Sequence, residues 1–118
     1  MNKFSIPKIT LYHLINELII TDKERVIFEI ENKKITREKL FQDILNAQNY
    51  LIESKLNQKD TVVSMLENSY EQITFFLATL CLGITWVPLG KDRKGVGLKY
   101  VLSITKPAVI FARKEKLI

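Results

Sequence analysis

The most constraining feature of the sequence is a run of 19 uncharged residues between Glu71 and Lys91. Its length approaches that of a membrane-spanning helix, which needs about 20 apolar residues. Gly83 and Pro88 interrupt the run, however, and one glutamine and three threonines dilute it. We therefore interpret it as a buried helix that ends at Gly83, followed by a buried strand that ends at Pro88, and not as a membrane span.

The rest of the chain alternates between helical and strand periodicities. Helical spacing of apolar residues predicts helices over Leu11–Ile20, over Arg37–Ser54, between Ser69 and Gly83, and through Leu98, Val101 and Leu102. Strand patterns predict four strands, at Val26–Ile30, Thr61–Leu66, Ile84–Val87 and Ala108–Phe111, with a turn at Asn32-Lys33 and a short return strand from Ile35. Alternation of this kind implies βαβ crossovers. We therefore predict an α/β fold with a small, mainly parallel sheet and helices packed on it.

Polar side chains and one glycine mark the expected helix ends. Thr10 and Thr36 are placed to cap the first two helices, and Ser69 with Gln72 forms a capping-box pattern at the third. Gly83 is predicted to be the left-handed C-cap of that third helix.

The third predicted helix is apolar around nearly its whole circumference, from Ile73 to Leu82. A helix of this kind is buried on more than one side. Two explanations remain open: the flanking helices cover it, or one face contacts further sequence or a partner.

Composition is typical of a globular protein, with 47% hydrophobic and 26% charged residues, and the net charge is +5. The basic residues spread along the chain, apart from two clusters, and no aromatic or motif signal of a nucleic-acid reader accompanies them. We therefore interpret both clusters as solvated surface and predict no nucleic-acid partner. The clusters are Lys91, Arg93 and Lys94, and Arg113, Lys114 and Lys116.

Cys81 is the single cysteine, so no internal disulfide can form. Residues 1–8 have no long apolar run before a small-residue cleavage site, and we expect no signal peptide. Both observations favour the cytoplasm.

Local patterns of catalytic chemistry are weak. His13 has no second histidine or cysteine at ligand spacing, and Cys81 lies on the most apolar helix. Gly95-Val96-Gly97 is half of a dinucleotide fingerprint, without the preceding strand or the third glycine. The pairs Glu29/Glu31 and Glu67/Glu71 are common on strand and helix surfaces. We therefore predict no catalytic, cofactor-binding or metal-binding residue in this chain.

Three stretches, in this order and spacing, resemble motifs of the AMP-forming adenylating superfamily. Ile35–Leu40 is similar to its early "(L/Y)TYxEL" element, with Arg37 in the usual aromatic position. Met65–Ser69 and the following helix resemble its "LPNSPEFVVAFLA" segment. Leu80–Leu89 resembles "LKAGAxYVPL" and is the most specific of the three. Leu98–Leu102 and Ala108–Phe111 are similar to the stretch that follows in the family.

This resemblance extends from Thr10 to Phe111 and implies the N-terminal subdomain of an adenylate-forming enzyme, a family that includes acyl-CoA synthetases, luciferases and nonribosomal peptide synthetase adenylation domains. The family's ATP loop, its ribose-binding Asp and its C-terminal Lys would all lie beyond Ile118. The resemblance therefore implies that residues 1–118 are a single partial domain, a fragment that binds no cofactor alone. ATP and Mg are implied for the complete enzyme, and the missing remainder of that enzyme is the expected partner.

The resemblance leaves the substrate open among fatty, aryl and amino acids. A different class of function also remains: a non-catalytic interaction module or relic that retains the α/β scaffold. A basic nucleic-acid-binding domain is the third and weaker hypothesis, and it predicts retention on a polyanion that falls steeply with salt.

Overall fold

The computed structural model describes residues 10–90 and 92–112, and it divides into two compact units, residues 1–41 and 42–118. The first unit contains α1 (Leu11–Asp22), β1 (Val26–Ile30), β2 (Lys33–Thr36) and the first residues of α2 (Arg37–Glu53). The second contains the rest of α2, then β3 (Thr61–Met65), α3 (Tyr70–Leu82), β4 (Thr85–Pro88), α4 (Gly95–Thr105) and β5 (Val109–Ala112).

The first unit contains an antiparallel hairpin of β1 and β2. Its turn residues are Glu31 (φ 51°) and Asn32 (φ 66°), two successive positive φ values that are typical of a type I′ turn. The predicted turn at Asn32-Lys33 is therefore displaced by one residue. The prediction that Val26–Ile30 belongs to the same mainly parallel sheet as the later strands is wrong. β1 pairs with β2 in a separate sheet, and the two-residue loop between them can join only antiparallel neighbours.

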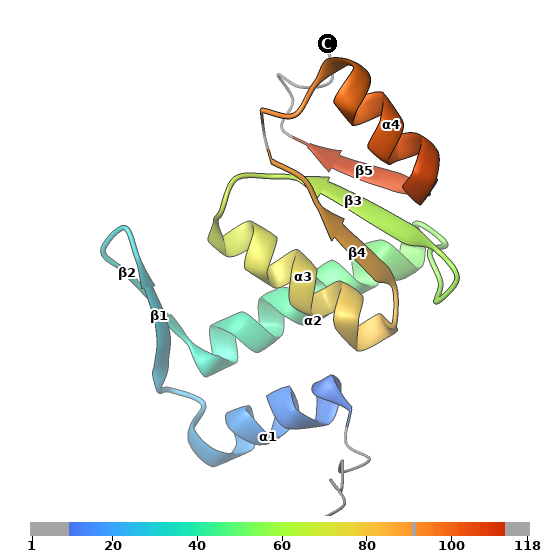
Figure 1. Cartoon of the computed structure of the whole chain (residues 1–118). Coiled ribbons are helices and arrows are strands. Elements are labelled where there is room, and N and C mark those ends of the chain that lie inside the picture. Colours follow the sequence, from blue (N-terminus) through green and yellow to red (C-terminus); the bar gives the residue numbers. More distant parts are fainter. Residues whose placement is uncertain (1–9, 91, 113–118) are drawn as a thin grey trace, which may run out of the picture. The chain divides into compact units, whose positions relative to one another are not determined.

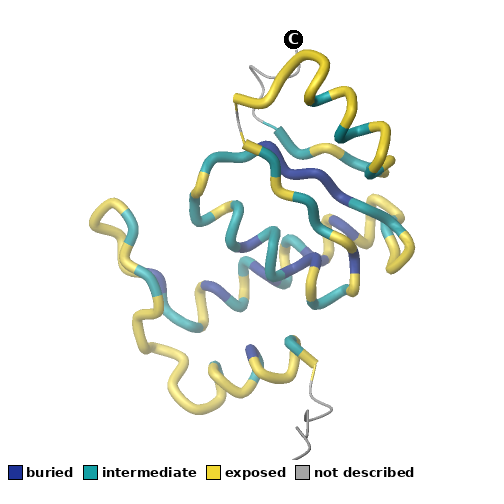
Figure 2. The backbone as a smooth tube through the Cα atoms, in the orientation of Figure 1, coloured by how far each residue is buried: buried dark blue, intermediate teal, exposed yellow. Residues whose placement is uncertain are grey.

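The second unit contains a three-stranded parallel sheet in the order β4-β3-β5, which confirms the predicted α/β class. α2 and α3 lie on one side of this sheet and α4 on the other (Figure 1). β3 is therefore covered on both faces, with Val62 and Val63 only 1% and 0% exposed, and it forms the centre of the core (Figure 2). Ile44 and Leu51 of α2 complete that core.

The predicted helix caps are present. The hydroxyl of Thr10 accepts from the His13 N–H, and that of Thr36 accepts from the Lys39 N–H. Ser69 accepts from the Gln72 N–H, and Gly83 ends α3 with φ +74°. These local signals placed the starts of α1, α2 and α3 and the end of α3.

Two boundaries near the C-terminus differ from the sequence prediction. α4 begins at Gly95 instead of Leu98. Lys91, of the first basic cluster, lies outside the described residues. β5 is displaced by one residue, to Val109–Ala112. Gly95 has φ +68°, which glycine adopts without steric cost, and this allows the chain to turn into the helix there.

α3 is less covered than its apolar sequence predicts. Only Thr74, Ala78 and Thr79 are buried, and Leu80 is 43% exposed. In the described part of the chain, the flanking helices therefore leave part of this helix open to solvent. None of the helices within residues 10–90 and 92–112 combines the length and apolar character of a membrane span.

Candidate functional site

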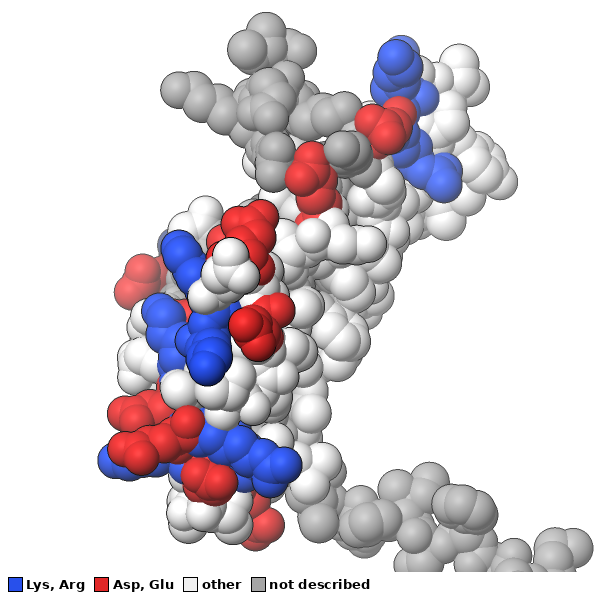
Figure 3. Space-filling view, turned by 90° about the vertical axis from the view of Figure 1, so that its left-hand side faces the viewer, with Lys and Arg blue, Asp and Glu red and all other residues white. Residues whose placement is uncertain are grey.

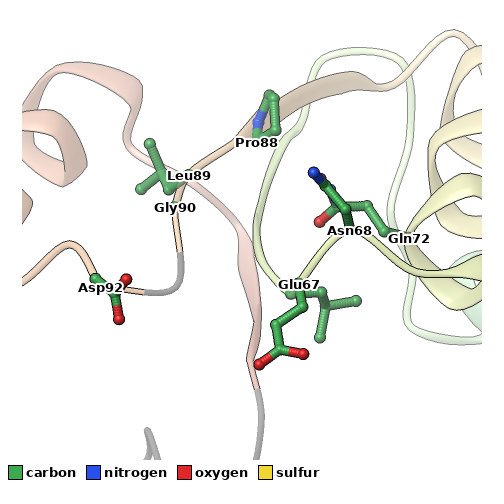
Figure 4. Close-up of a pocket in the computed structure, with 8 residues that line it drawn as sticks. Glu67, Asn68, Gln72, Pro88, Leu89, Gly90 and Asp92 are labelled. Atoms are coloured by element: carbon green, nitrogen blue, oxygen red, sulfur yellow. The ribbon is translucent and has the colours of Figure 1, made fainter.

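A pocket of about 490 Å³ lies at the carboxyl ends of β3 and β4 (Figure 4). From β3 the chain runs to α3 on one side of the sheet, and from β4 it runs to α4 on the other (Figure 1). Connections that depart to opposite faces open a crevice between the strand ends, which is where parallel α/β sheets bind ligands. Its lining residues are Leu66, Glu67, Asn68, Gln72, Pro88, Leu89, Gly90 and Asp92.

Backbone and capping hydrogen bonds at the strand ends hold the floor of the pocket. The Leu89 N–H donates to the Ser64 carbonyl at 2.8 Å, which extends the β3–β4 ladder one residue past Pro88. On the other side, Ser69 caps α3 and fixes where that helix begins. These two bonds therefore position Leu89 and the start of α3 on either side of the pocket.

Gln72 connects the pocket to the core. Its Oε1 accepts from the buried Ser64 hydroxyl at 3.2 Å, and its Nε2 donates to Asn68 Oδ1 at 3.3 Å. Ser64 is 1% exposed, so this bond satisfies a hydroxyl that would be costly to bury alone. The predicted capping box is formed in only one direction, because the Gln72 side chain is used here and Ser69 alone provides the cap.

Two carboxylate side chains, Glu67 and Asp92, line the pocket from its two walls (Figure 4). With the amides of Asn68 and Gln72 they make a site that favours hydrogen-bond donors and cations over anions. Within the described residues, no group of three His, Cys, Asp or Glu side chains is placed to hold a metal ion. The pocket therefore offers polar side chains that can form hydrogen bonds with a ligand.

No sequence pattern predicted this pocket. Its residues come from two segments about 20 positions apart, and no local motif joins them. The available signal was topological: two successive parallel strands, each followed by a helix, end at the same edge of the sheet. The prediction that the chain carries no catalytic or cofactor-binding residue stays a prediction.

The other candidate residues lie outside the pocket. His13 is exposed on α1, with Nδ1 2.8 Å from the Thr10 hydroxyl oxygen. Cys81 is half-buried on α3, and burial raises the pKa of its thiol, which disfavours the nucleophilic thiolate. Gly95 and Gly97 belong to α4. Of the glutamate pairs, Glu67 alone lines the pocket.

Tyr70 is the most perturbed titratable group in the described residues. Its hydroxyl, on α3, donates to Asp43 Oδ2 of α2 at 2.7 Å. Burial, and then the bond to Asp43, raise the pKa of Tyr70 far above its ordinary value of 10.0. Tyr70 is therefore a neutral hydrogen-bond donor that joins two helices.

Acidic and basic side chains intermingle on the face shown in Figure 3. An interleaved surface of this kind does not concentrate the positive field that nucleic-acid binding uses. The C-terminal cluster of Arg113, Lys114 and Lys116 lies outside the described residues. The absence of a nucleic-acid partner stays a prediction.

Comparison with models of protein families identifies one family. A model of the family described as "AMP-binding enzyme" matches residues 20–118. A comparison with curated protein sequences gave no significant match.

Solved structures similar to the chain include ATP-bound MatB from Rhodopseudomonas palustris, with a TM-score of 0.83 and 22% identity over 92% of this chain and 22% of MatB. An artificially fused adenylation–PCP di-domain, NpsA-ThdA from Klebsiella oxytoca, has a TM-score of 0.78 and 23% identity over 86% of this chain and 19% of the fusion. VinN in complex with 3-methylaspartate has a TM-score of 0.82 and 18% identity over 91% of this chain and 30% of VinN. At these identities the likeness shows a shared fold, and the chain spans 19% to 30% of these three proteins.

Proposed function

The chain belongs to the AMP-binding enzyme family, and from this membership we propose that it is the N-terminal part of an enzyme that uses ATP to activate a carboxylic acid. The product would be an acyl- or aminoacyl-adenylate, with release of pyrophosphate. The observation that carries the proposal is the family match over residues 20–118, on a chain whose fold is similar to that of an adenylation–PCP di-domain and of ATP-bound MatB.

We also propose that residues 1–118 by themselves are catalytically incomplete and cannot carry out adenylation. Its support is that the chain corresponds to 19% to 30% of the similar proteins. Adenylation needs a held triphosphate and groups that stabilise charge on the acyl-phosphate transition state. None of the described residues that line the pocket at the ends of β3 and β4 is basic, so the pocket supplies no cation to hold a triphosphate. ATP and its Mg ion would therefore be bound by the remainder of the enzyme, the partner of this chain.

The substrate is a carboxylic acid of the fatty, aryl or amino-acid class, and the cytoplasm is the proposed location. VinN was solved with 3-methylaspartate and with L-aspartate, and an amino acid is accordingly one of the substrates to test first.

The test is ATP–pyrophosphate exchange with a mixed pool of fatty, aryl and amino acids. Three samples are compared: the chain alone, the polypeptide encoded directly downstream of it, and the two together. We expect exchange only in the combined sample. Exchange by the chain alone would refute catalytic incompleteness.

Lack of exchange in all three samples would favour the other hypothesis, a non-catalytic interaction module on the same scaffold. Exchange by the downstream polypeptide alone would show that this chain is dispensable for adenylation. Dividing the pool into its three classes then identifies the substrate.

A further inference from the structure

The outer face of α4 carries large apolar side chains in an exposed position. α4 lies on the opposite side of the sheet from α2 and α3, and Figure 2 shows most of its length exposed. Val96, Tyr100 and Ile104 are 84%, 65% and 61% exposed. At about 100° per residue, the three side chains fall within about 80° of one another around the helix, so they form one stripe that faces solvent.

β5 adds a fourth exposed apolar side chain on the same side of the sheet. Phe111 is directed to the α2 and α3 side, since its ring centroid lies 4.7 Å from that of Phe75 and 6.0 Å from that of Tyr50. Successive side chains of a strand point to opposite faces, so Ile110 is directed to the α4 side. It is 39% exposed, and α4 therefore does not cover it fully.

The charges around the stripe have a single sign. From Arg93 to Ala112 the sequence contains four basic residues and no acidic one. All four are exposed. Two of them directly precede α4, one directly follows it, and the fourth lies about 60° around the helix from Val96. These basic residues are Arg93, Lys94, Lys99 and Lys106. The stripe is therefore bounded by cations at both ends and along one side.

The exposed hydroxyl on this face already has a partner within the helix. The Ser103 hydroxyl donates to the Tyr100 carbonyl at 2.6 Å. A hydroxyl that keeps such a bond costs little to remove from water. Tyrosine itself is enriched where water meets lipid, because its ring is apolar and its hydroxyl is polar. Neither side chain therefore opposes shallow insertion of this face into a membrane surface.

The sign of the charges identifies the kind of partner. An apolar stripe alone fits many partners, but four cations with no anion around it attract an anionic one. Nucleic acid would match the charges, yet it would leave Val96 and Ile104 without apolar contacts. A lipid surface supplies both, since lysine and arginine lay their stems on apolar surface while their charged ends reach the headgroups.

We propose that the outer face of α4 binds the surface of an anionic lipid bilayer. The stripe enters the headgroup region, and the basic side chains around it contact lipid phosphates. α4 has 11 residues and lies in the plane of the surface, since a span needs about 20. This inference goes beyond the proposed function and does not depend on it. The cytoplasmic leaflet is the anionic one, which agrees with the proposed location.

The first measurement is co-sedimentation of the 118-residue chain with lipid vesicles, with and without the polypeptide encoded directly downstream. Two compositions are compared: phosphatidylcholine alone, and phosphatidylcholine with about one third phosphatidylglycerol. We expect the anionic vesicles to bind at least about tenfold more tightly, and we expect salt to weaken this binding through screening. The downstream polypeptide should leave the binding in place.

Substitutions in the stripe test whether α4 is the surface that binds. The triple variant Val96→Gln, Tyr100→Gln and Ile104→Gln should bind anionic vesicles at least about tenfold more weakly. Ile52→Gln, at an apolar residue of α2 that is 55% exposed, is the control and should change binding by less than about twofold. Thermal melting checks that each variant folds.

Substitutions of the basic residues test the charge argument independently of the stripe. Lys94→Gln with Lys99→Gln should weaken binding by about fivefold for each charge removed. Lys33→Gln with Lys34→Gln makes the same change in net charge on the exposed β1–β2 hairpin and should change binding by less than about twofold. Equal effects of the two pairs would show that only net charge matters, which overturns the assignment to α4.

Other outcomes would identify a different occupant and refute the proposal. Loss of vesicle binding on addition of the downstream polypeptide would make the remainder of the enzyme the occupant. Self-association through the stripe without vesicle binding would make it a second copy. Retention on a polyanion without vesicle binding would make it nucleic acid. Equal affinity for the two lipid compositions would also overturn the proposal.

The proposed function and this inference fail separately. Pyrophosphate exchange in the mixture without vesicle binding would leave the function standing and overturn the lipid assignment. Vesicle binding that depends on α4, in the absence of pyrophosphate exchange, would do the reverse.

Discussion

At the scale of single residues, the bond from Tyr70 to Asp43 has a predictable dependence on pH. The pKa of Tyr70 is raised in the folded chain above its ordinary 10.0, so its contribution to stability is complete below that value. As pH rises above 10, the unfolded state loses the phenolic proton first, and the stability falls.

We expect Tyr70→Phe to lower the free energy of unfolding by about 1 kcal/mol near neutral pH, through loss of one hydrogen bond. Above about pH 10 the difference between wild type and variant should shrink. Urea unfolding at a series of pH values measures both effects. Tyr100→Phe, at a tyrosine 65% exposed on α4, is the matched control and should change stability by less than about 0.5 kcal/mol. A constant difference across pH would contradict this account.

Gly83 is the residue whose identity the backbone most restricts. Its φ is +74°, and a Cβ atom there would lie 3.2 Å from the Cγ of Gln58. We expect Gly83→Ala to destabilise by about 1–2 kcal/mol, because an L residue in left-handed backbone is strained. Thermal or urea unfolding provides the measurement.

Gly97 supplies the matched control for Gly83. It lies within α4, and a Cβ atom there meets nothing within 4 Å. Gly97→Ala should therefore stabilise the chain, by about 0.5–1 kcal/mol, since alanine loses less backbone freedom in a helix. Equal effects of the two substitutions would refute the role assigned to Gly83.

At the scale of elements, α4 is apolar on two sides. Leu98, Val101 and Leu102 are half-buried, whereas Val96, Tyr100 and Ile104 are 84%, 65% and 61% exposed. The exposed three recur at four-residue spacing and so form one stripe along the helix. Contiguous apolar surface of this kind promotes association.

We expect the triple variant Val96→Gln, Tyr100→Gln and Ile104→Gln to self-associate less than the wild type in sedimentation velocity over a concentration series. Its stability should change little, since all three side chains are largely exposed. Leu102→Gln, on the half-buried side of α4, is the contrasting variant and should lower the unfolding free energy instead. Unchanged association of the triple variant would show that the stripe is inert.

At the scale of the whole molecule, the chain has one covered sheet core and several incomplete surfaces. In the described residues β3 is covered on both faces, but no strand pairs with the outer edge of β5 and one stripe of α4 is exposed. The pocket at the strand ends is lined by acids and amides. This arrangement is expected of a part of an adenylating enzyme, and the combined pyrophosphate-exchange assay tests it directly.

The sequence by itself determined the features that depend on near neighbours along the chain. Periodicity identified the four helices of the described residues, single side chains such as Thr36 and Ser69 marked where helices begin, and Gly83 marked where one ends. The family resemblance was also carried by these local elements, because a capped helix and a helix-to-strand turn each need particular residues in a short window.

Only the tertiary structure decided which distant segments meet. It paired β1 with β2 outside the parallel sheet, placed Glu67 and Asp92 beside one pocket, directed Gln72 to Ser64, and placed β5 at one edge of the described sheet. Strand pairing and strand order arise from contacts between residues far apart in sequence, which periodicity does not encode. The physical reason is that a strand pattern specifies which side chains are buried but not which neighbour receives its hydrogen bonds.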